Sequence, residues 1–259
     1  MRLCIVIPAW NEEKRIGKTL EYYGKFFDGK FSLDFDYEIL VVINNCQDGT
    51  EDVVKKYQKK FKKIKYIRLI PGGKGFAITE GFREALKGNF DLIGFLDADM
   101  ATSPEEYYRL LKNINNCDGI IASRWKRGAV NNYSLKRRIF SHGFNFVIRA
   151  LLFLPYSDTQ CGAKIFRKDF VNHVVESIGI TAWAFDVNLL YLAKQKRFKI
   201  NEVATTWEDK EGSTVNVMKD TFSMLSAVLR LRLINSPFNF VVRAYDKLPN
   251  KVKNGQFIK

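Results

Sequence analysis

Histidine and paired cysteines, the usual ligands of zinc, are scarce in this chain. Its 259 residues contain two histidines, His142 and His173, and we expect each to be a surface or packing residue rather than a metal ligand. The four cysteines are scattered without paired spacing, which predicts neither a zinc site nor a disulfide framework and fits a reducing compartment. They are Cys4, Cys46, Cys117 and Cys161.

Long apolar runs are absent as well. No stretch approaches the roughly 20 consecutive apolar residues that a membrane-spanning helix needs, and no signal peptide precedes the first apolar run. We therefore expect no transmembrane helix, and a protein that meets a membrane only by lying on its surface.

Acidic residues are too few to balance the basic ones. With 42 lysines and arginines against 28 aspartates and glutamates, the chain has a formal net charge of +14 and a pI near 9.5. Such a charge predicts an anionic partner, which is a nucleic acid, a nucleotide diphosphate or an anionic membrane surface. No recognisable nucleic-acid-binding motif accompanies the charge, so we expect no nucleic acid partner.

What the sequence does contain is a regular alternation of short apolar runs with helical segments. This order is typical of an α/β domain with a mostly parallel central sheet and helices on both faces. The predicted strands are Leu3 to Ile7, Tyr37 to Ile43, Tyr66 to Ile70, Leu92 to Leu96 and Gly119 to Ala122. The predicted helices are Glu12 to Phe27, Thr50 to Lys60, Gly75 to Leu86 and Pro104 to Asn113. Ligands of such sheets bind beyond the carboxyl ends of the strands.

The segment from Ile93 to Pro104, IGFLDADMATSP, carries two carboxylates directly after an apolar strand. Asp97 and Asp99 are separated by one residue, so both side chains point the same way at the strand end. There they can hold a hard divalent cation against a diphosphate, which is the arrangement of metal-dependent group transfer. The alternative is that Asp99 only opens the turn before a capped helix.

Glycines surround Lys74 at the start of another predicted helix. Gly72, Gly73 and Gly75 leave the backbone free to approach a phosphate, which both the helix N–H groups and the lysine attract. A plain glycine turn with a solvated lysine is the alternative. The spacing matches neither the Walker A loop nor the dinucleotide-binding glycine fingerprint, so both of those site types are disfavoured.

Several motifs resemble, in matching order, the family 2 inverting glycosyltransferases of the GT-A fold. In the first half they are IVIPAWNEEKRIGKTL, VVINNCQDGTEDVV, GGKGFAITEGF and FLDADMATSPEE. In the second half, DTQCGAKIFRKD and WAFDVNLLYLA look like the dolichyl-phosphate glucosyltransferase branch, close to the dolichyl-phosphate mannose synthases. The resemblance implies a GT-A, Rossmann-like domain over residues 1–215 and a C-terminal extension of amphipathic helices over residues 216–259.

The resemblance also implies where a nucleotide-sugar donor binds. Trp10 stacks on the base in this interpretation, with a buried structural tryptophan as the alternative. Asn44 and Asn45 stand where relatives often carry two aspartates. Lys210 lies in WEDKEGS, which resembles a mobile lid over the diphosphate, although a plain exposed loop looks much the same. The implied donor-binding residues are Pro8, Ala9, Trp10, Glu12, Asn44, Gly73, Lys74, Asp97 and Lys210.

The chemistry implied by the resemblance is transfer to an acceptor that is already anionic. A lipid phosphate needs no dedicated base. Catalysis instead requires that the negative charge of the departing nucleoside diphosphate is stabilised by Mg²⁺ or Mn²⁺, which Asp97 and Asp99 hold. Asp186 in WAFDV is either a base for a hydroxyl acceptor, or a group that orients a cation or caps the following helix. The candidates for gripping the acceptor phosphate are Arg124, Arg137, Arg138 and Lys164.

We therefore expect an enzyme that moves a hexose, with inversion, from a nucleoside-diphosphate sugar to dolichyl or another polyprenyl phosphate. UDP-glucose is the favoured donor, with UDP-N-acetylglucosamine and GDP-mannose as alternatives. Ala101 weakens the mannose alternative, because it stands where mannose synthases tend to carry a glutamine. The alternative enzyme glycosylates a hydroxyl of a polysaccharide, lipid or protein, with Asp186 or another acid as an essential base. A non-catalytic scaffold is disfavoured by the intact pair of Asp97 and Asp99.

Two segments have the composition of interfacial helices. Ile139 to Leu154 follows the basic run of residues 136–138, and Phe222 to Val242 mixes large apolar side chains with arginines. The apolar stripe of the first segment consists of Phe140, Phe144, Val147 and Leu151. Packing on the sheet or in an oligomer is the alternative for each segment. Together with the net charge, they favour a peripheral, monotopic protein on an anionic cytosolic leaflet.

Overall fold

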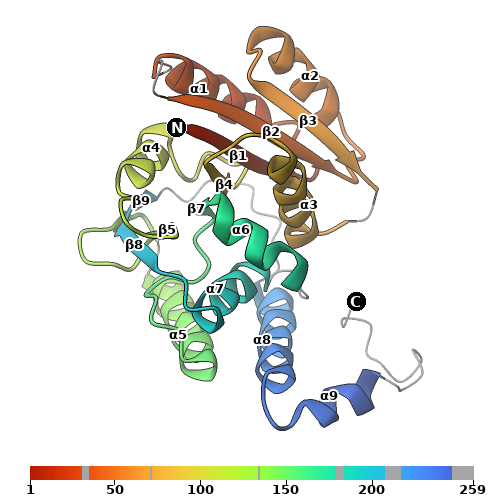
Figure 1. Ribbon diagram of the computed structural model, residues 1–259, viewed down its shortest axis with the longest axis vertical. Helices are drawn as coiled ribbons and strands as arrows, with labels where there is room; N and C mark the ends of the chain where they lie inside the picture. The colour runs from red at the N-terminus through yellow and green to blue at the C-terminus, as the bar shows by residue number, and fades with distance from the viewer. Residues whose placement is uncertain (31–34, 71, 134, 179–183, 208–216, 247–259) are drawn as a thin grey trace.

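A seven-stranded sheet lies at the centre of the computed structural model, which describes residues 1–30, 35–70, 72–133, 135–178, 184–207 and 217–246 (Figure 1). The strands are β1 (Arg2–Ala9), β2 (Asp36–Asn44), β3 (Ile64–Leu69), β4 (Leu92–Leu96), β5 (Gly119–Ser123), β7 (Ala163–Arg167) and β8 (Ile200–Ala204). Their order across the sheet is β3-β2-β1-β4-β7-β5-β8. Only β7 among these strands runs antiparallel to its neighbours, β4 and β5. A short ribbon pairs β6 (Val130–Asn131) with β9 (Thr206–Trp207).

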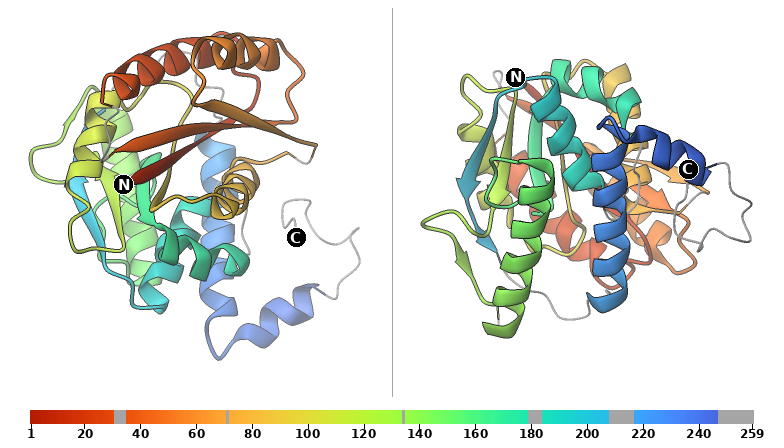
Figure 2. Two further views of the ribbon diagram at one scale, coloured as in Figure 1. Left: turned by 45° about the horizontal axis from the view of Figure 1, so that its top comes forward. Right: turned by 90° about the horizontal axis from the view of Figure 1, so that it is seen from below.

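Helices cover both faces of the sheet. On one face lie α1 (Ile16–Asp28), α2 (Thr50–Lys60) and α4 (Pro104–Lys112), and on the other lie α3 (Lys74–Lys87), α6 (Lys168–Val174) and α7 (Phe185–Gln195). A 3-10 turn, Val175–Ser177, follows α6. Two longer helices, α5 (Leu135–Leu152) and α8 (Val217–Ile234), pack side by side, and α9 (Asn239–Asp246) follows α8 (Figure 2).

The predicted α/β architecture is confirmed, because apolar side chains of the central strands are buried on both faces of the sheet. Strand β1 shows the pattern, since Val6 belongs to the core under α3 while Ile5 and Ile7 belong to the core under α1. The first helix begins at Ile16 rather than at Glu12. The intervening residues form a turn, in which Asn11 has a φ of 53° and the backbone N–H of Arg15 donates to the carbonyl of Glu12 (2.9 Å).

The C-terminal helices are partly core elements. Met224, Val228 and Leu231 of α8 are buried in the same apolar cluster as side chains of α5, α6 and α7, so this part of α8 packs on the domain. In the predicted stripe of α5, Phe144 and Leu151 are half-buried against that cluster, as the packing alternative expects. The boundary predicted at residue 216 stays a prediction.

A run of basic residues lies at one edge of the molecule. The run from Lys55 to Arg68 spans α2 and β3, and β3 is an edge strand of the sheet that exposes Lys65 and Arg68. Figure 1 places α2 and β3 at the end of the molecule opposite α8 and α9. Part of the positive charge therefore lies away from α8 and α9.

A glycine inside β4 permits a close contact between three elements. Gly94 is buried, and a Cβ there would lie 2.6 Å from the carbonyl oxygen of Lys164 in β7 and closer still to the hydroxyl of Tyr107 in α4. The missing side chain leaves room for the Tyr107 hydroxyl to donate to the Lys164 carbonyl (3.3 Å). The absence of a side chain at Gly94 thus allows Tyr107 of α4 to reach across β4 and contact the antiparallel strand β7.

We expect Gly94→Ala to lower the free energy of unfolding by about 1–3 kcal/mol, because the added methyl group overpacks a core whose nearest atoms include backbone. Gly143→Ala is the matched control, since Gly143 is exposed in α5 and a Cβ there meets nothing within 4 Å. The control should gain roughly 0.5–1 kcal/mol from helix propensity. Urea unfolding measures both, and equal stability of the two variants would contradict the packing argument.

Candidate active site

The predicted donor residues meet at the carboxyl ends of neighbouring strands. β1 pairs with both β2 and β4, so Pro8 and Ala9 lie between the end of β2, at Asn44, and the end of β4, before Asp97. Gly73 and Lys74 join this edge, because the Asn44 amide nitrogen donates to the Gly73 carbonyl (3.0 Å) at the start of α3. The strand-end convergence expected from the sequence is present.

Lys74 forms an ion pair with Asp97. Burial acts to lower the pKa of Lys74, but the carboxylates of Asp97, Asp186 and Asp99 outweigh it and hold that pKa well above its ordinary value. Gly162 packs directly on Asp97, since a Cβ there would lie 2.9 Å from Oδ1 and closer to Oδ2. Asp97 is therefore held between a cation and a backbone segment, with 35% of its side chain exposed.

The surroundings of Asp99 disfavour its negative charge. Burial, and next the charge of Asp97, raise the pKa of Asp99, while the backbone N–H of Ala101 donates to its Oδ1 (3.0 Å). A raised carboxyl pKa means that added positive charge at this point would be favourable. Among the described residues, no group of three or more histidine, cysteine, aspartate or glutamate side chains is arranged around one metal position. Two carboxylates with substrate phosphates fit the way Mg²⁺ is commonly held in nucleotide sites.

Lys164 lies in the interior of the protein. Its side chain is fully buried, forms an ion pair with Asp186 and donates to the carbonyl of Cys161 (2.5 Å). Asp186 lies in the first turn of α7 and is itself nearly buried. The arrangement matches the interpretation of Asp186 as a group that orients a cation. Together, Lys74, Asp97, Asp99, Lys164 and Asp186 form what we call the charge cluster.

The loops after β1 and β2 are joined by side-chain hydrogen bonds to backbone N–H groups. The backbone N–H of Glu12 donates to the Thr50 hydroxyl (2.7 Å), and the backbone N–H of Gly49 donates to Glu13 (3.1 Å). The Glu12 carboxylate binds Arg15 through both oxygens (2.8 and 2.9 Å). Burial raises the pKa of Glu12 and exceeds the opposing effect of Arg15. These contacts hold the rim of the predicted nucleotide pocket.

Two residues of this rim have side-chain surface or atoms available to a ligand. Trp10 is 55% exposed, so the alternative of a buried structural tryptophan is wrong, and its ring is accessible for stacking. The Oδ1 atom of Asn44 is buried and has no hydrogen-bond partner within the described part of the chain. An acceptor in that state is costly unless a donor group reaches it.

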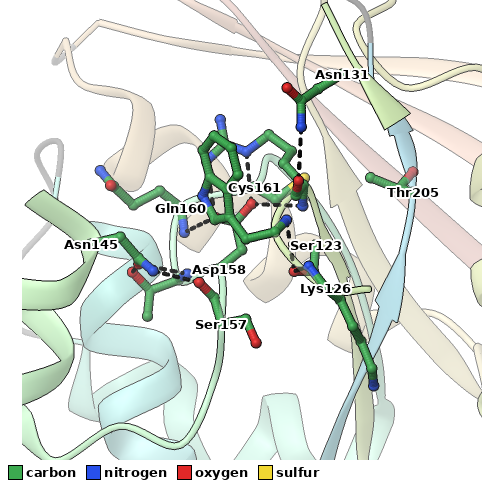
Figure 3. Close-up of polar contacts among 12 residues, drawn as sticks. Ser123, Lys126, Asn131, Asn145, Ser157, Asp158, Gln160, Cys161 and Thr205 are labelled. Carbon is green, nitrogen blue, oxygen red and sulfur yellow. Dashed lines mark hydrogen bonds and ion pairs between the residues drawn. The ribbon is translucent and has the colours of Figure 1, made fainter. Parts of the chain in front are cut away.

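Arg124, at the end of β5, is engaged by Asp158. Its Nε and Nη2 donate to the two carboxylate oxygens of Asp158 (2.7 and 2.9 Å), its backbone N–H donates to Oδ2 (3.0 Å), and its Nη1 donates to the Tyr133 hydroxyl (2.9 Å). Burial disfavours both charges, yet the pairing raises the pKa of Arg124 and lowers that of Asp158. Figure 3 shows the Asp158 surroundings.

Aromatic rings line the Arg124 side chain. The guanidinium carbon lies 5.6 Å from the ring centre of Trp207, 5.7 Å from Trp125 and 6.0 Å from Tyr133, distances typical of cation–π contacts. His142 of α5 packs against Trp125 in a tilted arrangement, with ring centres 3.9 Å apart. These rings connect Arg124 to α5 and to the β6–β9 ribbon.

The other predicted acceptor and lid residues lie outside this centre. Arg138 is exposed on α5, and Arg137 lies in the first turn of the same helix. Lys210 lies outside the described residues. The roles of these residues stay predictions.

Three polar residues of the site were not identified from the sequence. Asp158 opens the motif DTQCGAKIFRKD, and only the resemblance marked it, without a role. Asn145, in the α5 segment read as amphipathic, is a buried polar residue, and Glu202 lies within β8. Their partners in other elements are 12 to 45 residues away in the chain, so no local spacing reveals them.

Comparisons with known proteins agree with this geometry. Residues 4–175 match the family described as Glycosyl transferase family 2. A protein of Drosophila melanogaster named dolichyl-phosphate beta-glucosyltransferase is 35% identical over 227 residues, which cover 82% of this chain and 69% of that protein. The Homo sapiens protein of the same name is 30% identical over 246 residues, covering 90% and 75%.

Solved structures share the fold. Glucosyl-3-phosphoglycerate synthase from Mycobacterium tuberculosis, in complex with Mn²⁺, UDP and glucosyl-3-phosphoglycerate, superposes with a TM-score of 0.64 at 16% identity. The match covers 89% of this chain and 79% of that one. At this identity the likeness concerns the fold alone, and that fold is the GT-A arrangement expected from the sequence. With the matched residues spanning well over half of its length, the chain belongs to glycosyl transferase family 2.

Proposed function

We propose that this protein transfers glucose, with inversion, from UDP-glucose to dolichyl phosphate or another polyprenyl phosphate. The observation that carries the proposal is the charge cluster, in which carboxylates meet the buried Lys164 and the half-buried Lys74 at the strand ends beside the loops of the nucleotide pocket. The choice of glucose and of the lipid phosphate is supported by the shared name of the relatives, dolichyl-phosphate beta-glucosyltransferase.

Asp97 and Asp99 would hold Mg²⁺ or Mn²⁺ in this proposal. The ion, when bound, supplies positive charge to the diphosphate as it departs from the sugar. Lys74 balances Asp97 before the donor arrives, and it lies at the start of α3, where N–H groups also attract phosphate oxygens. Trp10 offers an exposed ring to the base.

The acceptor needs no dedicated base, because a lipid phosphate is already ionised at neutral pH. Asp186 is committed to Lys164, which makes it a group that fixes a buried cation rather than one that removes a proton. Arg124 would contact the acceptor phosphate. The pair of reactants is then held between carboxylate-bound metal on the donor side and an arginine on the acceptor side.

A membrane surface is the proposed source of the acceptor. Large apolar side chains are exposed on α5 and around α8 and α9, and they form what we call the apolar surface: Ile139, Phe140, Phe146, Val147, Phe153, Leu229, Ile234, Phe238, Phe240 and Val241. Arginines accompany it, since Arg138 is exposed and the guanidinium of Arg232 lies 5.3 Å from the ring centre of Phe153. Apolar side chains flanked by cations suit an anionic lipid interface. None of the described helices has the length and apolarity to cross a bilayer.

The reaction is tested with purified protein, dolichyl phosphate and Mg²⁺ or Mn²⁺. Offered UDP-glucose, UDP-N-acetylglucosamine and GDP-mannose separately, the protein should give one glycosylated lipid phosphate, from UDP-glucose, detected by mass spectrometry. A product from another donor would correct the sugar. Nucleotide binding with no lipid product would favour a hydroxyl acceptor instead.

We expect Asp99→Ala to lower the rate of transfer by about 100-fold or more, since one electrostatic contact to the departing diphosphate is commonly worth that much. The buried charge is removed, so the fold should be retained. Asp52→Ala is the control, because Asp52 is an exposed carboxylate of α2. Initial rates with saturating UDP-glucose decide the matter, and near-normal turnover in Asp99→Ala would remove Asp99 from the proposed metal site.

The apolar surface is tested by vesicle binding. Replacing Phe146 and Phe240, which are 68% and 61% exposed, with serine should weaken sedimentation with phosphatidylserine vesicles by about tenfold, because each change removes a large apolar contact. Tyr22→Ser on α1, 52% exposed, should leave binding unchanged. Arg138→Glu should weaken binding more at low salt than at high salt. Unaltered binding of the double variant would show that this surface faces away from lipid.

A further inference from the structure

We infer that Asp158 is a positioning residue that aims Arg124 at the acceptor phosphate. Asp158 would set the affinity for the acceptor without touching it. The inference rests on the proposed function, in which Arg124 contacts that phosphate.

The hydrogen bonds of Arg124 define which part of the guanidinium is left for a ligand. An arginine side chain has five N–H donors in a planar fork. Asp158 takes the edge formed by Nε and Nη2, and Tyr133 takes one donor of Nη1. At most two donors remain, one on each terminal nitrogen. Because Asp158 holds one edge of the Arg124 guanidinium, the remaining N–H donors point in a fixed direction. Two such donors can bind two oxygens of a phosphate.

Asp158 is itself held rigidly. It is buried, and it accepts further hydrogen bonds from the backbone N–H groups of Arg124 and Gln160 (3.0 and 3.1 Å). The Glu202 carboxylate accepts the backbone N–H groups of Ser157 and Asp158 through its two oxygens (3.0 and 2.8 Å). A carboxylate with this many partners does not rotate freely, so it transmits its orientation to the arginine.

The loop of residues 157–162, which we call the Asp158 loop, is tied to α5 and α8 as well. Asn145 of α5 accepts the hydroxyl and the backbone N–H of Thr159 (2.9 and 3.2 Å) and donates to the Ser157 carbonyl (Figure 3). The amide nitrogen of Gln160 lies 3.0 Å from the sulfur of Met224 in α8. The helices that carry the apolar surface therefore hold the loop that holds Arg124.

The far end of the same loop reaches the donor side of the site. The carbonyl of Cys161 accepts from Lys164, and Gly162 packs on Asp97. Burial, and next the charge of Asp158, raise the pKa of the Cys161 thiol to about 12, so the thiol stays neutral and the loop contributes only its backbone here. Six residues thus connect the acceptor arginine to the donor carboxylate, and the loop fixes the separation between the two reactants.

The inference is tested with Asp158→Asn, which keeps the shape of the side chain and removes its charge. We expect the KM for dolichyl phosphate to rise about 10- to 100-fold, as misplacement of a reacting group typically costs. The KM for UDP-glucose should stay within about twofold, because Asp158 has no described contact with the charge cluster. Asp36→Asn is the control, since Asp36 is a carboxylate paired with Arg2 and Lys63 at the opposite end of the sheet.

A double-mutant cycle separates positioning from a merely structural role. If Asp158 acts through Arg124, the variant with both Arg124→Lys and Asp158→Asn should have the acceptor KM of Arg124→Lys alone, not the product of the two effects. Asp158→Glu, which restores the charge on a longer side chain, should recover part of the acceptor affinity. If Asp158→Asn does not yield folded protein, Asp158→Glu replaces it in the cycle, with a smaller shift and the same lack of additivity expected.

The results that overturn the inference differ from those that overturn the function. Equal rises in both KM values, an acceptor KM within twofold of the unaltered chain, or additive effects in the cycle would overturn the role of Asp158 alone. No transfer to dolichyl phosphate by the unaltered chain would overturn the proposed function, and the inference with it.

Discussion

Compensation of buried charge at the strand ends is the constraint on which the site depends. Lys164 is fully buried and Asp186 nearly so, and each would be unfavourable without the other. Asp158 and Arg124 form a second such pair, with side chains 1% and 12% exposed. Each ion is committed to a partner, and Asp158 is further held by backbone N–H groups of Arg124 and Gln160. Rigidity at the site is thus a result of the cost of burying charge.

The antiparallel direction of β7 explains why both ion pairs lie at the carboxyl ends of the parallel strands. β7 begins with Ala163 opposite Leu96, the last residue of β4, so the loop that precedes β7 arrives where the parallel strands end. In an all-parallel sheet, the loop that precedes a strand would lie at the amino ends of the strands instead. Because β7 runs antiparallel to β4, the Asp158 loop and Lys164 lie close to the carboxylates that follow β4.

Much of this arrangement is predictable from the sequence, because it follows from local patterns of apolar and polar residues. Apolar runs predicted β1 to β5, five of the seven strands of the sheet, whereas β7 and β8 were missed. Asp97 and Lys74 stand at strand and helix ends where parallel topology brings them together. The burial of Lys164 was not foreseen, since its position depends on the direction of β7, which a short apolar run does not reveal. The Arg124 and Asp158 pair was missed for a related reason. The two residues are 34 apart, and the motif around each gives no sign of the other.

The exposed cations on β3 affect how copies of the protein behave at high concentration. β3 ends the sheet, so it has one row of backbone groups without a neighbouring strand, and such an edge can recruit the sheet of a second molecule. Lys65 and Arg68 are exposed on that strand, and like charges on two approaching copies would repel each other. The basic edge thereby opposes aggregation through the sheet when the protein is concentrated.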